Sequence, residues 1–107
     1  MTTVKFFSED NIIRGFEIKG HSGFADKGED IVCAGISSAS IMAANTVTDV
    51  IGADASVIVE DGYIRLYLNE SDPSSEAVLK GLSRHLSGIS KQYPQFVRII
   101  LGGVKND

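Results

Sequence analysis

The sequence predicts one α+β domain in which two helices cover one face of a mainly antiparallel five-stranded sheet. Short segments with alternating apolar residues occur in pairs around turn residues, and two longer segments repeat apolar residues at helical spacing. The predicted order is therefore strand, strand, helix, strand, strand, helix, strand. Placing both helices on the same sheet face buries both apolar stripes in a single core.

Length and composition are those of an ordinary globular domain. The chain has 107 residues, with 43% hydrophobic and 22% charged residues, which suits a single domain over 1–107. No uninterrupted apolar run approaches the ~18 residues of a membrane span, and the first residues lack the apolar region of a signal peptide. A net charge of −4 argues against nucleic acid as a direct partner. We therefore expect a cytoplasmic protein with no membrane contact.

The first two strands are expected over residues 2–8 and 12–19, with a polar turn between them. One face of this pair is apolar and is expected to point inward: Val4, Phe6, Phe16 and Ile18. The two strands form a probable hairpin, and the second delivers His21 to one end of the sheet.

A first helix is expected over residues 31–51. Its apolar stripe recurs at spacings of three, four and seven: Val32, Ile36, Ala43, Val47 and Val50. The stretch 34–40 is poor in bulky side chains, which favours close packing against the sheet or the other helix. Gly52 is a good helix terminator.

A second hairpin is expected over residues 55–60 and 63–69, around the turn Asp61-Gly62. In its second strand, apolar residues alternate with Tyr63, Arg65 and Tyr67. This polar face is either a solvated sheet face or a groove or subunit interface, where tyrosine and arginine are enriched.

The second helix is expected to begin at Pro73, after Asp72 as cap, and to end near Tyr93-Pro94. His85 lies beside its apolar stripe, and we interpret it as a surface residue rather than a catalytic one. The last strand, over residues 95–101, is apolar enough to be central in the sheet.

The residues with chemical potential lie between Gly20 and Cys33. This segment holds the single cysteine and one of the two histidines, and its glycines indicate a loop that runs into a helix. We expect Asp30 to cap that helix, which places Cys33 at its third position. The backbone N–H groups of a helix start and a nearby imidazolium such as that of His21 both favour a thiolate. The Asp30 carboxylate opposes a thiolate, and the sequence leaves this balance open.

The cysteine has two interpretations. A lone cysteine is usually a small buried hydrophobic residue. The histidine, the glycine-rich loop and the helix start instead match the pattern of an activated nucleophile. Ser37 lies one helical turn beyond Cys33, so it contacts the site or the substrate, or else has a core or surface role. With only one cysteine, an intrachain disulfide is excluded, and a cysteine-based zinc site is disfavoured.

The motif Gly-His-Ser-Gly-Phe-Ala, followed by Gly-Glu-Asp-Ile-Val-Cys-Ala-Gly-Ile-Ser, resembles the signature of the ribosomal-processing cysteine proteases, the Prp family. The resemblance extends over the whole chain in length and order of elements. The family's signature residues fall on Gly20, His21, Asp30, Cys33 and Ser37. Gly35 departs from the family, where alanine is expected; it lowers helix propensity without touching the chemistry.

The resemblance implies a cysteine endopeptidase that removes the N-terminal extension of a large-subunit ribosomal protein, the twenty-seventh in the standard series. Such an enzyme supports ribosome assembly, works without a cofactor or metal, and forms a homodimer. Its catalytic residues would be His21 and Cys33, with Gly20, Asp30, Ser37 and Phe24 supporting the site or binding substrate. The peptide would carry aromatic residues just before the cut, so an apolar pocket should adjoin Cys33.

Three further expectations concern the reaction. Backbone N–H groups at the helix start near Cys33 are candidates for stabilising the oxyanion. The acidic loop residues Asp26 and Glu29 would meet the basic substrate. The loop over 22–29 is expected to be mobile and to close over a bound peptide, with Phe24 as one anchor.

Two alternatives remain open on the residues alone. One is a non-enzymatic ribosome-associated or redox-sensing binding protein whose Cys33 is structural. The other is a different thiol enzyme, such as an acyl transferase. Whether a peptide bond is cut, as measured by mass spectrometry, separates the protease from both.

Overall fold

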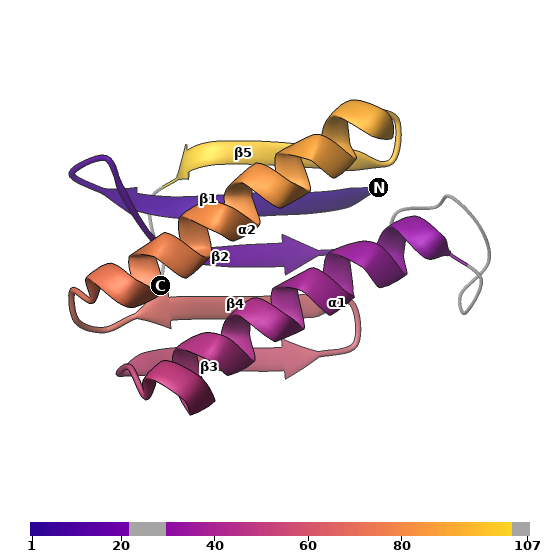
Figure 1. Cartoon of the computed structure of the whole chain (residues 1–107). Helices are drawn as coiled ribbons and strands as arrows, with labels where there is room; N and C mark the ends of the chain where they lie inside the picture. Colours follow the sequence, from indigo (N-terminus) through magenta and orange to yellow (C-terminus); the bar gives the residue numbers. More distant parts are fainter. Residues whose placement is uncertain (22–29, 104–107) are drawn as a thin grey trace.

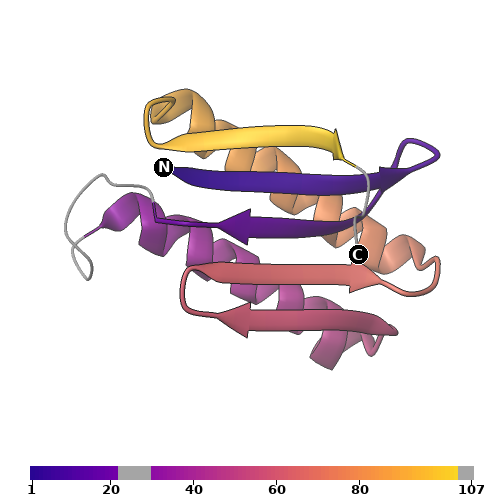
Figure 2. The same cartoon turned by 180° about the vertical axis from the view of Figure 1, so that it is seen from behind.

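The computed structural model describes residues 1–21 and 30–103, and they form a five-stranded sheet with two helices packed on one face (Figure 1). Figure 2 shows the opposite face of the sheet without a covering helix. The elements in chain order are β1 (Thr2–Glu9), β2 (Ile12–Lys19), α1 (Ile31–Asn45), η1 (Thr46–Ile51), β3 (Ala55–Glu60), β4 (Tyr63–Leu68), α2 (Pro73–Gln92) and β5 (Val97–Gly103). The predicted fold class and element order are confirmed.

The strand order is β3-β4-β2-β1-β5. Three neighbouring pairs are antiparallel, and only β1 and β5 run parallel. Both predicted hairpins are therefore present. The prediction that the last strand is central is wrong, because β5 lies at an edge and pairs with β1 alone. The helix α2 lies over β5 and covers its start, so Val97 is buried, whereas Leu101 near its end is 62% exposed.

The first helix changes its winding near its C-terminal end. After Asn45 the chain continues as the π-helix η1, and Gly52 ends it with φ of 74°. The hydroxyls of Thr46 and Thr48 donate to the carbonyl oxygens of the residues four positions earlier, at 2.7 and 3.0 Å. The prediction that Val50 belongs to the buried stripe is wrong, since Val50 is 79% exposed. A π-helix has more residues per turn than an α-helix, so its wider turn rotates Val50 away from the core.

The core lies between the sheet and the two helices. Its largest fully buried side chains come from the sheet and from the helices that cover it: Val4, Phe6, Phe16, Ile36, Val47, Leu66, Leu68, Leu79, Leu86 and Val97. By length and composition alone, the helical stretch Ile31–Ile51 could span a membrane. Here one side of that stretch packs on the sheet as a core helix does, through residues such as Val32, Ile36 and Val47.

The uncovered sheet face carries the polar residues of β4. The Tyr63 hydroxyl donates to Glu17 at 2.8 Å, and the ring of Tyr67 packs against Phe7 with centroids 5.9 Å apart. The Arg65 guanidinium lies 5.6 Å from the centroid of the Phe7 ring. Contacts within the face itself therefore leave Tyr63, Arg65 and Tyr67 only partly exposed.

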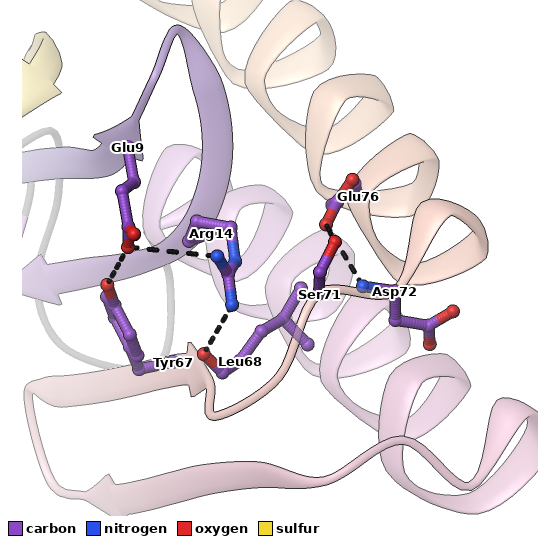
Figure 3. Close-up of polar contacts among 7 residues, drawn as sticks. All are labelled: Glu9, Arg14, Tyr67, Leu68, Ser71, Asp72 and Glu76. Carbon is purple, nitrogen blue, oxygen red and sulfur yellow. Dashed lines mark hydrogen bonds and ion pairs between the residues drawn. The ribbon is translucent and has the colours of Figure 1, made fainter.

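Polar contacts of Arg14 and Glu76 lie at the end of the sheet next to the start of α2 (Figure 3). Arg14 on β2 contacts both neighbouring strands. Its Nη2 donates to the Leu68 carbonyl of β4 at 3.4 Å, and its Nη1 lies 3.7 Å from a carboxylate oxygen of Glu9 on β1. At the start of α2, Glu76 accepts from the Asp72 backbone N–H at 3.0 Å. Asp72 is the predicted cap residue, and its carboxylate accepts from the Ser75 hydroxyl at 2.6 Å.

Candidate active site

His21 stands just beyond the end of β2. Gly20 precedes it with φ of 85°, and its backbone N–H donates to the Gly62 carbonyl at 2.9 Å. A side chain at position 20 would meet the Met1 carbonyl oxygen at 2.8 Å, which is too close for a Cβ atom. Glycine is therefore required here by both backbone angle and space, and the conformation brings the exposed His21 to the rim of the sheet.

Cys33 is the third residue of α1, as predicted. Asp30 is the N-cap, and its carboxylate oxygen Oδ1 accepts from the Cys33 backbone N–H at 2.9 Å. Asp30 is only 8% exposed, so the cap is held inside the structure. The cap fixes the first helical turn and leaves the Cys33 side chain half-buried beside the loop end.

The two predicted catalytic residues are in contact. The Cys33 sulfur Sγ lies 3.7 Å from the His21 ring nitrogen Nδ1, although the residues are twelve positions apart in sequence. At this separation a proton can pass between thiol and imidazole, and the ring tautomer decides which of them donates. A nucleophile within reach of a base is the arrangement that covalent catalysis by a thiol needs.

A cleft of about 520 Å³ opens at this pair. Ile18, Ile64 and Val59 come from three adjacent strands and are paired in register. The other lining residues are Gly20, His21, Asp30, Cys33, Ala34, Ser37, Ile41, Glu60, Asp61, Gly62 and Tyr63. Ile41 and Val59 are large apolar residues left 42% and 58% exposed, so the cleft offers apolar surface to a ligand.

The structure brings most of the predicted site residues together. Gly20, Asp30 and Ser37 line the cleft beside His21 and Cys33. Phe24 and the loop over 22–29, with its acidic residues and its predicted closure, lie outside the described residues. His85 is exposed on α2 and lines a separate groove between the helices, in agreement with its interpretation as a surface residue.

Sequence reasoning missed the contribution of the second hairpin to this site. The turn Asp61-Gly62 was recognised as a hairpin turn, yet nothing local in the sequence shows that it lies beside His21. Val59 and Ile41 gave no local signal either, because single apolar residues are common on protein surfaces. Their meeting at one cleft depends on the pairing of the strands.

Two backbone N–H groups at the start of α1 already donate hydrogen bonds within the protein. The Cys33 N–H donates to the Asp30 carboxylate, and the Ala34 N–H donates to the Asp30 carbonyl at 3.0 Å. An oxyanion that used the Cys33 N–H would share it with a carboxylate. Use of the Cys33 N–H for the oxyanion would therefore require the cap to relax during the reaction.

No metal site is evident in the part of the chain that the structure describes. Across residues 1–21 and 30–103, no group of three or more His, Cys, Asp or Glu side chains could hold a metal ion.

Together, the fold and the cleft define a small α+β protein with a thiol and an imidazole in contact at an apolar binding cleft. The family model "Cysteine protease Prp" matches residues 1–98 of this chain. The chain therefore belongs to the Prp family of cysteine proteases.

Individual relatives agree with this assignment. The ribosomal processing cysteine protease Prp of Bacillus subtilis (strain 168) is 33% identical over 99 residues, covering 86% of this chain and 88% of the relative. A crystal structure of Prp from S. aureus, with a covalently linked product peptide, superposes with a TM-score of 0.89 at 21% identity. That match covers 94% of this chain and 99% of the other, and at this identity it shows the fold alone. A Streptococcus mutans protein matches at 25% identity with a TM-score of 0.83, over 95% and 94% of the two chains.

Proposed function

We propose that this protein is a cysteine endopeptidase that removes the N-terminal extension of a large-subunit ribosomal protein, the twenty-seventh in the standard series. The observation that carries the proposal is the contact of 3.7 Å between Cys33 Sγ and His21 Nδ1 at the mouth of an apolar cleft. The curated relative is called a ribosomal processing protease, and S. aureus Prp has been crystallised with a substrate peptide. Removing the extension would support ribosome assembly.

The proposed reaction uses the two residues in turn. His21 takes the thiol proton, and the Cys33 thiolate attacks the scissile carbonyl carbon to form a tetrahedral oxyanion. The imidazolium then gives its proton to the leaving amine, and the C–N bond breaks to leave a thioester on Cys33. A water molecule, deprotonated by His21, attacks the thioester, and the acid product leaves as the thiol is restored.

The cleft also supports the proposed substrate chemistry. Its apolar lining, with Ile41 and Val59 exposed at one side, suits the aromatic residues expected just before the cut. Glu60 and Asp61 place carboxylates at its rim, and the chain has a net charge of −4. A basic ribosomal segment would be steered toward such a site.

The protein is further proposed to act in the cytoplasm as a homodimer, with no nucleic acid, membrane or cofactor taking part. A subunit contact would be supported by exposed apolar side chains on α1 and β3 that do not line the cleft: Ile31, Met42, Val57 and Ile58. Along α1 and η1 the only charged residue is Asp49, whereas the exposed side of a surface helix usually carries several charges.

The test is a cleavage assay on a synthetic peptide that carries the extension and the following residues, with products identified by mass spectrometry. The Cys33→Ala variant is expected to fold normally and to lose cleavage completely, because no nucleophile remains. The His21→Ala variant should lose at least about a hundredfold in kcat, since proton transfer by a positioned side chain contributes 10²–10⁴-fold.

The matched control is His85→Ala, which removes the other histidine from an exposed position outside the cleft. It should cleave at the parent rate. Turnover retained in Cys33→Ala would reject the protease. An uncut peptide with every variant, including the parent, would instead favour a binding protein or another thiol enzyme.

A further inference from the structure

We propose that the β3–β4 turn, Asp61-Gly62, holds the His21 imidazole in place against Cys33, and that Gly62 is the positioning residue. The proposal rests on the proposed function, because it assumes that His21 acts on Cys33. It assigns a catalytic consequence to a hairpin turn that is forty residues away from His21 in sequence and carries no reacting group.

The first observation is a backbone link. The ladder between β2 and β4 ends at the pair Lys19 and Tyr63. One residue further, the Gly20 N–H donates to the Gly62 carbonyl at 2.9 Å. This hydrogen bond extends the ladder past the end of β2, so the backbone that precedes His21 is tied to the turn.

The second observation is the position of the His21 imidazole ring next to Gly62. A Cβ atom built on Gly62 would lie 3.2 Å from Nε2 of His21 and 3.8 Å from both Cδ2 and Cε1. The Nε2 edge of the imidazole therefore borders the space that a Cβ atom on Gly62 would occupy, and such an atom would push the ring by a few tenths of an ångström. The other nitrogen, Nδ1, faces Cys33 Sγ at 3.7 Å. The ring lies between the thiol and the turn, and a side chain at position 62 would displace it.

Gly62 also has φ of 70°, so any substitution there adds backbone strain to the contact with the ring. Gly52 separates the two effects. Its φ is 74°, nearly the same, and nothing lies within 4 Å of a Cβ atom built on it. The Gly52→Ala variant therefore carries similar backbone strain without any contact with His21.

The same turn belongs to the substrate cleft, since Glu60, Asp61 and Gly62 all line it. A peptide that fills the cleft therefore meets the element that supports the ring.

The experiment compares Gly62→Ala with Gly52→Ala. Both variants should lose similar thermal stability, because both place a Cβ atom at positive φ. Only Gly62→Ala should lower kcat, by roughly three- to tenfold, because a misplacement of about 1 Å costs about 10²-fold and the expected shift of the ring is a few tenths of that distance. The rate of Cys33 alkylation by iodoacetamide, followed across pH, should move toward the profile of His21→Ala in Gly62→Ala alone.

A second variant isolates the side chain from the strain. Asparagine tolerates positive φ better than alanine, so Gly62→Asn should recover stability while keeping the kinetic defect. It also replaces Gly62→Ala if that variant does not fold. Equal alkylation profiles in the parent and in Gly62→Asn would overturn the proposal, as would equal defects in Gly62→Ala and Gly52→Ala. Alkylation needs no peptide, so its outcome stands even if the proposed ribosomal substrate is wrong.

Discussion

At the scale of single residues, three residues position the nucleophile and the imidazole of the site: Asp30, Gly20 and Gly62. Asp30 joins the helix start to the nucleophile, because its carboxylate accepts from the Cys33 N–H. Gly20 and Gly62 fix the backbone and the ring of His21. The two glycines are needed because a side chain at either position would come too close to a neighbouring group, whereas Asp30 is needed for its carboxylate.

The role of Asp30 as a cap can be tested with two substitutions. Asp30→Ala removes the acceptor and should lower the free energy of unfolding by about 1 kcal/mol, the usual cost of losing an N-cap. Asp30→Asn keeps an oxygen acceptor at the same position and should retain most of the stability. Chemical denaturation of both variants gives the measurement. Equal losses in the two variants would show that the negative charge, rather than the cap geometry, stabilises α1.

On the uncovered sheet face, burial and then the hydrogen bond to Glu17 raise the pKa of Tyr63 above its ordinary value of about 10. The fold thus favours the protonated phenol, and this contribution is fully present below that ordinary pKa and is lost as pH rises through the raised value. Glu17→Gln should lower the pKa of Tyr63, so tyrosinate absorbance should appear at lower pH. Tyr63→Phe identifies its signal among the three tyrosines. A midpoint unchanged by Glu17→Gln would contradict the assignment.

At the scale of elements, the two helices differ in what limits their stability. The helix α1 is fixed at its start by a buried cap and ends in the π-helix η1. The helix α2 is longer and contains Gly81 and Gly88 within it. A glycine inside a helix costs about 0.5–1 kcal/mol relative to alanine, because it loses more backbone freedom on folding.

The Gly88→Ala variant should therefore raise the free energy of unfolding by about 0.5–1 kcal/mol. Nothing lies within 4 Å of a Cβ atom built there, and the position is exposed. Thermal denaturation gives the measurement, and cleavage activity should stay at the parent value. Gly15→Ala is the opposite case, because its Cβ atom would collide with the Leu66 carbonyl oxygen. A lower melting temperature for Gly88→Ala would mean that this helix position is not the open site described.

The expected closure of the loop over 22–29 also belongs to this scale and stays a prediction. The described residues on either side of it are His21 and Asp30, and neither belongs to a helix or strand. Both of these residues line the cleft.

At the scale of the whole molecule, the sheet order places the site. The strand β2 lies at the centre, with β4 and β1 on either side, so His21 emerges beside the turn of the second hairpin. Helix α1 crosses the same sheet (Figure 1), and Cys33 in its first turn lies beside His21. One cleft is thus assembled from β2, β3, β4 and α1, which are separate in the chain.

Local patterns in the sequence determined the element types, their order, the cap at Asp30 and the identity of the candidate pair. Alternation, helical spacing, capping residues and turn residues act over a few positions, so one sequence contains their full signal. The motif around His21 and Cys33 was informative for the same reason, because its residues lie in one short segment.

Only the tertiary structure decided where distant segments meet. The edge position of β5 and its parallel pairing with β1 depend on how α2 returns the chain across the sheet. The exposure of Val50 depends on a local π-helical winding that apolar spacing does not encode. The position of the His21 ring next to Gly62, and the cleft lined by Ile41 and Val59, exist because strand pairing and helix packing join residues far apart in sequence. Such contacts arise from the packing of the whole core, and no periodicity within one segment specifies them.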